Sequence, residues 1–235
     1  MAICRGSPQK RPLFCVHGAG GNVLNFKPLS DRLGPQQPFY GLQAQGVDGR
    51  TPPQPTIEAM AEQYLQAVFT VEPDGPYRLA GYSGGGVIAM EMARRLREAG
   101  RVVELLVMID TLAPRAARAS VSLPRKLWLM RHWSVQHALG WFARRRSGRR
   151  DQLRHAQALA RKASGEALPP ELADLHLFNN FLQAQLRHDP QPWPGNLLLF
   201  RARDCDTLSL NAGPCLGWQA LVGGEIRVVT VPGSH

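Results

Sequence analysis

The sequence predicts an α/β protein with a mostly parallel central sheet, helices on the faces of the sheet, and a helical lid inserted late in the chain. Strand-like and helix-like segments alternate, and the strand-like segments are nearly continuous apolar runs, which is typical of parallel strands buried on both faces. With 235 residues, of which 44% are apolar and 20% charged, the chain is long enough for one large domain.

Six apolar segments carry the expected sheet. The first is short and ends in the glycine-rich loop HGAGG, and each later one is followed by a helical or loop segment. The predicted strands are residues 12–16, 38–44, 77–82, 102–110, 196–202 and 225–231.

The helices between these strands are predicted from periodicity and capping. Apolar residues between Ile57 and Val68 recur at helical spacing, and Thr56 is expected to cap that helix. Residues 26–33 and 87–100 are also predicted to be helical. Residues 115–190 are predicted to be mostly helical and are mostly polar. We therefore predict one domain, residues 1–235, with a core of about 12–114 and 191–235 and a lid of about 115–190.

The N-terminal segment and the cysteines indicate the cellular compartment of the protein. Residues 1–12 lack the apolar stretch of a secretion signal and are predicted to be a short, poorly ordered leader. No apolar run approaches the roughly 18 residues that a membrane span needs. The four cysteines show neither a CxxC pair nor a histidine at ligand spacing, and Cys15 is expected in the core. These features indicate a cytoplasmic protein with free thiols and no metal site. The four are Cys4, Cys15, Cys205 and Cys215.

The net charge of +10 is concentrated in the insert. Residues 115–165 contain 13 Lys or Arg and one acid, Asp151. The run ARRRSGRR (143–150) could be an exposed loop, a nucleic-acid patch, a membrane-surface element or a docking site for an acidic partner. No nucleic-acid motif or interleaved aromatic residue supports nucleic-acid binding. In the same insert, Trp128, Trp133 and Trp141 either pack the lid onto the domain or line an apolar channel.

The segment GYSGG (81–85) predicts a nucleophilic serine. It matches G-x-S-x-G between a predicted strand and a predicted helix, which is the context that this motif requires. A serine on so tight a turn needs neighbours without side chains two residues away, and Gly81 and Gly85 meet that need. The alternative is nucleotide binding, since residues 84–89 fit G-x-G-x-x-A. That fingerprint normally follows the first strand of its fold, whereas here several predicted elements precede it.

Ser83 needs a base that a third group orients. His235 follows the last strand and Asp110 ends the strand next to that of the serine, so we expect both at the carboxyl edge of the sheet. Asp204, and less so Asp206, compete with Asp110 for the third position. The order serine, acid, histidine is that of the α/β-hydrolases.

An oxyanion hole completes the predicted site. One donor is expected to be the backbone N–H of Gly84, and the other to come from the loop after the first strand, at Ala19. His17 lies in that loop, and we expect it to have a structural rather than a catalytic role.

Four segments together carry a family resemblance: residues 13–33, 76–96, 105–115 and 228–235. They resemble the thioesterase domains at the ends of nonribosomal peptide synthetases and polyketide synthases. The resemblance implies an α/β-hydrolase fold and no directly bound cofactor. It also implies an upstream carrier protein, which delivers an acyl or peptidyl thioester on its phosphopantetheine arm.

In the chemistry that this resemblance implies, Ser83 takes the acyl chain with His235 as base, and hydrolysis or macrocyclisation releases it. In the terminal branch the acid follows the strand after the nucleophile helix, which matches Asp110; the stand-alone editing (type II) branch would favour Asp204. An editing thioesterase, a general serine esterase and a non-catalytic binding module of hydrolase fold are the alternatives. The family continues beyond this histidine into a loop and a helix, whereas His235 is the last residue here, so we expect it to fray.

Overall fold

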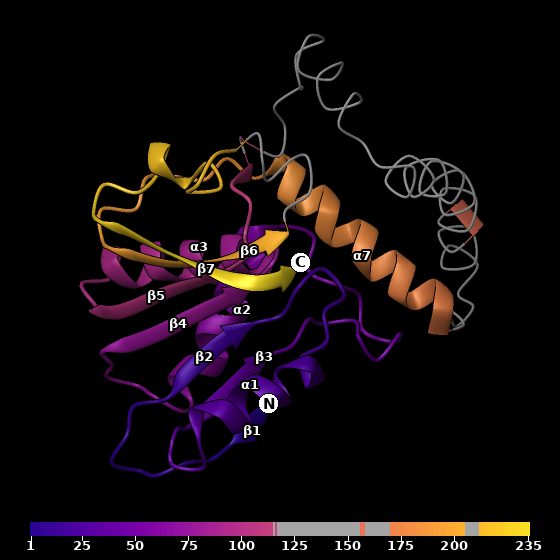
Figure 1. Ribbon diagram of the computed structural model, residues 1–235. Helices are drawn as coiled ribbons and strands as arrows, with labels where there is room; N and C mark the ends of the chain where they lie inside the picture. Colours follow the sequence, from indigo (N-terminus) through magenta and orange to yellow (C-terminus); the bar gives the residue numbers. More distant parts are fainter. Residues whose placement is uncertain (115, 117–155, 158–169, 205–211) are drawn as a thin grey trace, which may run out of the picture.

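The computed structural model describes residues 1–114, 116, 156–157, 170–204 and 212–235. Its centre is a seven-stranded sheet in the order β1-β3-β2-β4-β5-β6-β7 (Figure 1). All neighbouring strands are parallel except β1, which is antiparallel to β3. The strands are β1 Ala2–Cys4, β2 Leu13–Val16, β3 Phe39–Leu42, β4 Tyr77–Tyr82, β5 Val103–Ile109, β6 Leu197–Asp204 and β7 Ile226–Ser234.

The N-terminal segment corrects one prediction. It was expected to be a poorly ordered leader, but Ala2 pairs with Tyr40 in β3, and the N-terminal amine donates to the carbonyl of Gly41 at 2.9 Å. The segment AIC is too short to show a periodicity, so only the unpaired edge of β3 makes it a strand. The six predicted strands are all present, with β6 and β7 each extending further towards the carboxyl edge than expected.

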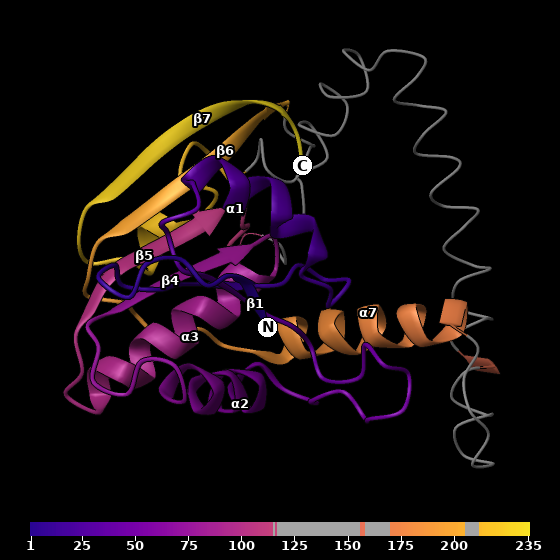
Figure 2. The ribbon, with the colours of Figure 1, turned by 90° about the horizontal axis from the view of Figure 1, so that it is seen from below.

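Helices cover both faces of the sheet (Figure 2). Helices α2 (Ile57–Phe69) and α3 (Gly85–Glu98) lie on one face, and the short α1 (Lys27–Leu33), preceded by a 3₁₀ turn at Leu24–Phe26, lies on the other. Thr56 caps α2 as predicted, because its hydroxyl accepts from the N–H of Ala59 at 3.1 Å. Successive strand residues alternate between two buried clusters, one on each face of the sheet.

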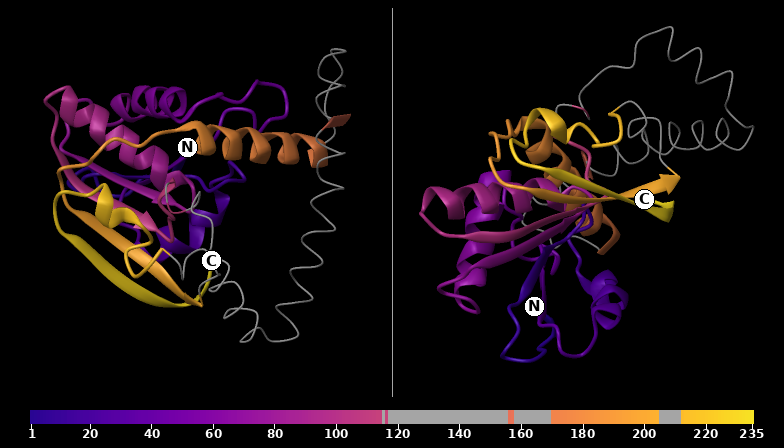
Figure 3. Two further views of the ribbon diagram at one scale, coloured as in Figure 1. Left: turned by 90° about the horizontal axis from the view of Figure 1, so that it is seen from above. Right: turned by 60° about the vertical axis from the view of Figure 1, so that its left-hand side comes forward.

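Helix α7 (Pro170–Arg187) reaches past the carboxyl edge of the sheet (Figure 3). It buries Leu177, Phe181 and Ala184. Just after the helix, His188 Nδ1 is 2.6 Å from a carboxylate oxygen of Glu58 at the start of α2. The rest of the predicted lid, with the basic run 143–150 and the three tryptophans, lies outside the described residues. The lid boundaries therefore stay predictions.

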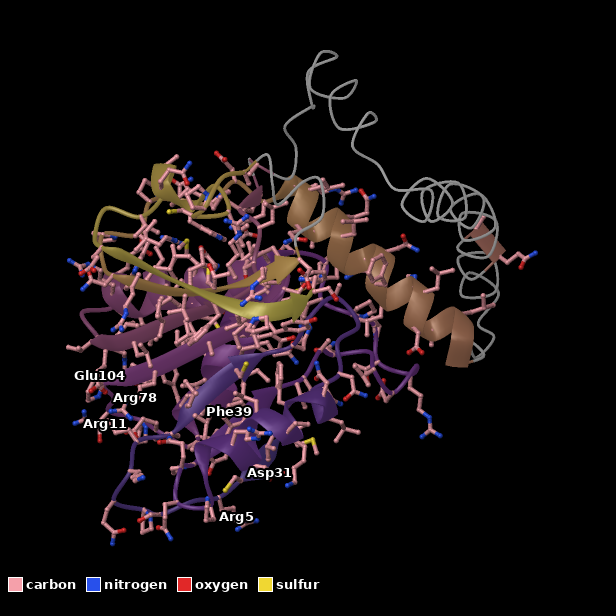
Figure 4. The ribbon with its side chains drawn as sticks, in the orientation of Figure 1. Arg5, Arg11, Asp31, Phe39, Arg78 and Glu104 are labelled. Carbon is pink, nitrogen blue, oxygen red and sulfur yellow. The ribbon has the colours of Figure 1, made fainter. Side chains whose placement is uncertain are left out.

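The amino ends of the strands carry an exposed ion-pair group. Glu104 of β5 accepts from Arg78 of β4 at 2.9 Å and from Arg11 at 3.3 Å, as Figure 4 shows at the lower left. Such exposed pairs contribute little to stability. Cys15 is buried in the core as predicted, and Cys4, Cys15 and Cys215 are free thiols. Within the described ranges, no helix is both long and apolar enough to cross a membrane.

Candidate active site

Ser83 lies on a sharp turn between β4 and α3. Its φ of 53° is in the left-handed region, and its N–H donates to the carbonyl of Ile109 at 2.8 Å. A Cβ on Gly81 would lie 2.4 Å from the carbonyl oxygen of Gly85, and one on Gly85 would lie 2.0 Å from that of His17. Neither position has room for a side chain, so both glycines of the motif are required by the close approach of three backbone segments.

Asp110 occupies the corresponding position on the neighbouring strand. It follows β5 directly, has a φ of 51°, and donates its N–H to Phe200 of β6 at 2.7 Å. The hydrogen-bond ladder of the parallel sheet thus continues one residue beyond each strand. This continuation holds Ser83 and Asp110 in adjacent positions at the carboxyl edge, although both have a strained backbone conformation.

A chain of hydrogen bonds joins three of the predicted residues. Ser83 Oγ is 2.9 Å from His235 Nε2, and His235 Nδ1 is 2.7 Å from Asp110 Oδ2. Since a carboxylate only accepts, Nδ1 carries the proton in the neutral ring and Nε2 is free to accept from the serine hydroxyl. The arrangement can therefore move the hydroxyl proton of Ser83 to His235 as the serine attacks.

The carboxylate of Asp110 is held in its charged form. The hydrogen bond from His235 lowers the pKa of Asp110 below its ordinary value, and the N–H of Ala202, which donates to Oδ1 at 3.0 Å, acts in the same direction. Partial burial opposes this shift but does not cancel it. An ionised Asp110 near neutral pH is suited to orienting His235 and to balancing the charge of an imidazolium.

The alternative acid lies nearby in the sheet. Asp204 is the exposed last residue of β6 and pairs in register with Ser234, but the Nδ1 hydrogen bond of His235 goes to Asp110. Asp206 lies outside the described residues. The expectation that His235 would fray is wrong in this structure, because both of its ring nitrogens are hydrogen-bonded to residues on two other strand ends.

The two predicted oxyanion donors lie beside Ser83. Gly84 caps the N-terminus of α3, where the helix end favours negative charge. Ala19 lies in the loop after β2, whose Gly18 is close enough that a Cβ there would be 3.7 Å from that of Ser83. Within the described parts of the chain, the backbone N–H groups of Gly84 and Ala19 have no acceptor. An N–H group without a protein acceptor is what an oxyanion hole requires at each position.

His17 has the structural environment that was expected. It is 1% exposed, its Nδ1 lies 2.5 Å from the carbonyl of Gly18, and its Nε2 lies 2.6 Å from the hydroxyl of Tyr64. Because a carbonyl only accepts, Nδ1 carries the proton and Nε2 accepts from Tyr64. Burial lowers the pKa of His17 to about 4. The ring is therefore neutral at physiological pH, and both of its nitrogens are already used.

Gly86, directly after the GYSGG motif, serves helix packing. A Cβ on Gly86 would lie 2.2 Å from the hydroxyl oxygen of Thr111, just after β5. Gly86 therefore lets α3 approach the end of that strand closely. This contact explains Gly86 without a bound phosphate, whereas the alternative interpretation of residues 84–89 was nucleotide binding. In the described part of the chain, no group of acids, cysteines and histidines is arranged to hold a metal ion.

Three features of the site were not predicted. The ring of Tyr82 stacks on that of His235, with centroids 5.5 Å apart and planes 15° from parallel. The N–H of Ala202 supports Asp110. Phe181 of α7 covers the nucleophile turn, since a Cβ on Gly84 would lie 2.4 Å from its ring. Tyr82 stood inside the motif and could have been noted, whereas no local signal marks a phenylalanine 98 residues after the serine.

Comparisons with known proteins identify the family of the chain. The family model for the thioesterase domain matches residues 11–235. The chain is 31% identical to a dimodular nonribosomal peptide synthase of Bacillus subtilis (strain 168), over 98% of this chain and 10% of the relative. It is 30% identical to malpibaldin synthetase of Mortierella alpina, over 97% of this chain and 4% of the relative. The chain thus spans a tenth or less of the length of these two curated relatives.

Solved structures agree on the fold. A four-domain nonribosomal peptide synthetase bound to AMP and glycine superposes with a TM-score of 0.72 at 27% identity, covering all of this chain and 18% of the other. The thioesterase domain of NocB from the nocardicin cluster superposes with a TM-score of 0.65 at 22% identity, covering 97% of this chain and 85% of the other. The mostly parallel sheet with helices on both faces is that of an α/β-hydrolase.

Proposed function

The chain belongs to the thioesterase domain family, and on that premise we propose that it releases an acyl or peptidyl chain from a carrier-protein thioester through Ser83, His235 and Asp110. The observation that carries the proposal is the hydrogen-bond chain from Ser83 Oγ through His235 to Asp110. A serine, a base and an orienting carboxylate in this order are the components of acyl transfer through a covalent ester.

In the proposed first step, Ser83 Oγ attacks the thioester carbonyl carbon while its proton passes to His235 Nε2. The carbonyl oxygen becomes an oxyanion, which on this proposal accepts hydrogen bonds from the N–H groups of Gly84 and Ala19. The carbon–sulfur bond then breaks, and the imidazolium of His235 gives its proton to the leaving thiolate. The products are an acyl ester on Ser83 and the free thiol of the phosphopantetheine arm.

In the proposed second step, His235 takes a proton from water, or from a hydroxyl or amine of the acyl chain itself. The activated oxygen or nitrogen attacks the acyl-serine carbonyl, and His235 returns the proton to Ser83 Oγ as the ester bond breaks. Water releases an acid, and an internal nucleophile releases a ring. Asp110 stays ionised throughout and balances the charge of the imidazolium in both steps.

The terminal branch of the family is favoured over the editing branch by the identity of the acid. The resemblance assigns Asp110 to domains at the ends of synthetases and Asp204 to stand-alone editing enzymes, and His235 Nδ1 is hydrogen-bonded to Asp110. We accordingly propose an upstream carrier domain as the partner. On this proposal the protein needs no bound cofactor of its own, because phosphopantetheine arrives with the carrier.

A fluorophosphonate probe tests the nucleophile. Intact-mass measurement is expected to show one adduct on the wild-type chain, with peptide mapping placing it on Ser83. Ser83→Ala should remove the adduct, and the matched control Ser7→Ala, in the N-terminal segment, should keep it. An adduct that persists in Ser83→Ala, or a wild-type chain that takes up no probe, would contradict the proposal.

A pair of aspartate variants tests the acid. Asp110→Ala is expected to lower kcat for a small acyl thioester by about 10³-fold or more, since His235 loses the group that holds its tautomer. Asp204→Ala, at the end of the adjacent strand, should change kcat less than about threefold. A larger loss of kcat in Asp204→Ala than in Asp110→Ala would identify Asp204 as the triad acid and favour the editing branch.

A further inference from the structure

Tyr82 occupies the variable position of the motif, directly before Ser83, and its ring touches three parts of the site. One face lies against the imidazole of His235, with centroids 5.5 Å apart and planes 15° from parallel. Phe26, at the end of the 3₁₀ turn, meets the ring edge to face at 6.4 Å and 90°. A Cβ on Gly18 would lie only 2.9 Å from Tyr82 Cδ1, so the loop that carries Ala19 packs directly on the ring.

The two ring hydrogen bonds of His235 do not by themselves fix the plane of the imidazole. The bonds to Ser83 and Asp110 leave from Nε2 and Nδ1 and define a line across the imidazole. These two bonds do not prevent rotation of the ring about that line. The side chain of His235 is 53% exposed, so much of its surface contacts solvent rather than packed protein. A flat ring stacked on the imidazole opposes this rocking, because tilting the imidazole would open or compress the contact between the two faces.

The charge surroundings give the stack a second effect. Asp110 faces His235 through Nδ1, Asp204 pairs in register with the preceding residue Ser234, and Arg201 of β6 acts electrostatically on Asp110. Against these charged groups, Tyr82 offers an uncharged π face. Such a face attracts a cation more strongly than a neutral ring, so it favours the imidazolium that forms when Ser83 loses its proton.

We propose that Tyr82 is a positioning residue for His235: its ring sets the plane of the imidazole between Ser83 and Asp110 and stabilises the imidazolium. Through Gly18 the same ring also supports the loop that carries Ala19. The proposal rests on the proposed function in its kinetic part alone, since the stack itself is a property of the folded protein. It predicts that the aromatic face of Tyr82 matters and that its hydroxyl does not.

The kinetic test compares Tyr82→Phe, which keeps the face, with Tyr82→Leu and Tyr82→Met, which remove it. With a small acyl thioester, Tyr82→Leu and Tyr82→Met are expected to lower kcat by about 10- to 100-fold with KM within about twofold, because misorientation of the base affects the chemical step. Tyr82→Phe should stay within about threefold of wild type. The acidic limb of the profile of kcat/KM against pH should move about 0.5 unit lower in the two aliphatic variants.

Tyr40→Leu is the matched control for loss of aromatic packing. Tyr40 lies in β3, away from the triad, and its ring centroid is 5.5 Å from that of Phe14 in β2. Circular dichroism and thermal melts confirm folding of each variant. Should Tyr82→Leu fail to fold, the more flexible Tyr82→Met carries the comparison. A loss of kcat in Tyr40→Leu equal to that in the Tyr82 variants would show a merely structural effect and overturn the proposal.

Nuclear magnetic resonance of the His235 ring separates this proposal from the proposed function. The wild type and Tyr82→Phe should share one titration midpoint and one ring-current shift at Cε1–H, and the aliphatic variants should lose that shift and titrate at lower pH. This readout needs no turnover. If the wild type shows these shifts but does not hydrolyse thioesters, the proposed function is wrong and the role of Tyr82 in positioning His235 still stands. Identical spectra in all variants defeat the stack.

Discussion

Two histidines lie close to the same serine turn, and their surroundings make them chemically different. His17 is almost fully buried, uses both ring nitrogens for bonds to Gly18 and Tyr64, and has its pKa lowered to about 4 by burial. His235 is more than half exposed and places one nitrogen on Ser83 and the other on Asp110. A base must be able to take up a proton and return it, and only the surroundings of His235 allow both.

The comparison teaches that proximity to a nucleophile does not by itself select a base. The backbone carbonyl of His17 packs closely against Gly85, just after the serine turn. His17 thus shapes the site through its backbone and its place in the core, while His235 meets the serine with its side chain. Variants of the two residues and of their neighbours should accordingly separate loss of chemistry from loss of folding.

The largest effect is expected for His235→Ala. Removing the base should lower kcat for a small acyl thioester by about 10³-fold or more, with little change in the free energy of unfolding, because the side chain is largely exposed. Steady-state kinetics and urea denaturation measure the two quantities. A variant that keeps more than about a tenth of wild-type kcat would transfer the role of base to another group.

Gly85→Ala should act through folding. The new Cβ would lie 2.0 Å from the carbonyl oxygen of His17, so the turn and the first loop must separate, at a cost of about 3 kcal/mol in the free energy of unfolding. Gly20→Ala is the matched control, because a Cβ there meets nothing within 4 Å. It should stay within about 0.5 kcal/mol of wild type. Equal urea midpoints for the two variants would contradict the packing argument.

His17 should make the protein sensitive to acid. Its pKa is lower in the folded state than the ordinary 6.5, so the unfolded chain binds the proton more readily. The stability is therefore full above pH 6.5 and falls as the pH drops from there to about 4, by up to about 3 kcal/mol. His17→Gln, which does not titrate, should show a weaker loss of stability across this window.

A control for acid sensitivity is required because the pKa of Asp110 is also lowered, and its contribution is likewise lost as the pH falls. Asp110→Asn removes that contribution and leaves His17 in place. Urea denaturation at several pH values, carried out on both variants, separates the two groups. If His17→Gln and wild type lose stability in parallel between pH 6.5 and 4, then His17 is not the acid-sensitive group.

The smallest effect is expected for Tyr64→Phe. The substitution leaves His17 Nε2 buried without a donor, which should cost about 1 to 2 kcal/mol in the free energy of unfolding and leave kcat nearly unchanged. Tyr40→Phe removes a hydroxyl that bonds no described residue and should be neutral. Thermal melts compare the two, and equal melting temperatures would show that the bond to His17 does not contribute.

Much of the fold was predictable because its signals are local. The local signals are apolar runs, the Thr56 cap and the glycines around Ser83, and each reflects a backbone requirement within a few residues. Six of the strands were predicted from such signals. The edge strand β1 was missed because three residues carry no periodicity, and only the open edge of β3 makes them a strand.

The sequence by itself determined the residue types and the strand ends that bear them: Ser83 on a turn that only glycines permit, an acid after the next strand, and a histidine after the last. Tertiary structure alone showed that His235 Nδ1 contacts Asp110 rather than Asp204, because both acids follow strands at the same sheet edge. It also decided the contacts of Tyr82 and Phe181. The contact of Tyr82 with His235 spans 153 positions and that of Phe181 with Gly84 spans 97, and no local pattern encodes a distance across the fold.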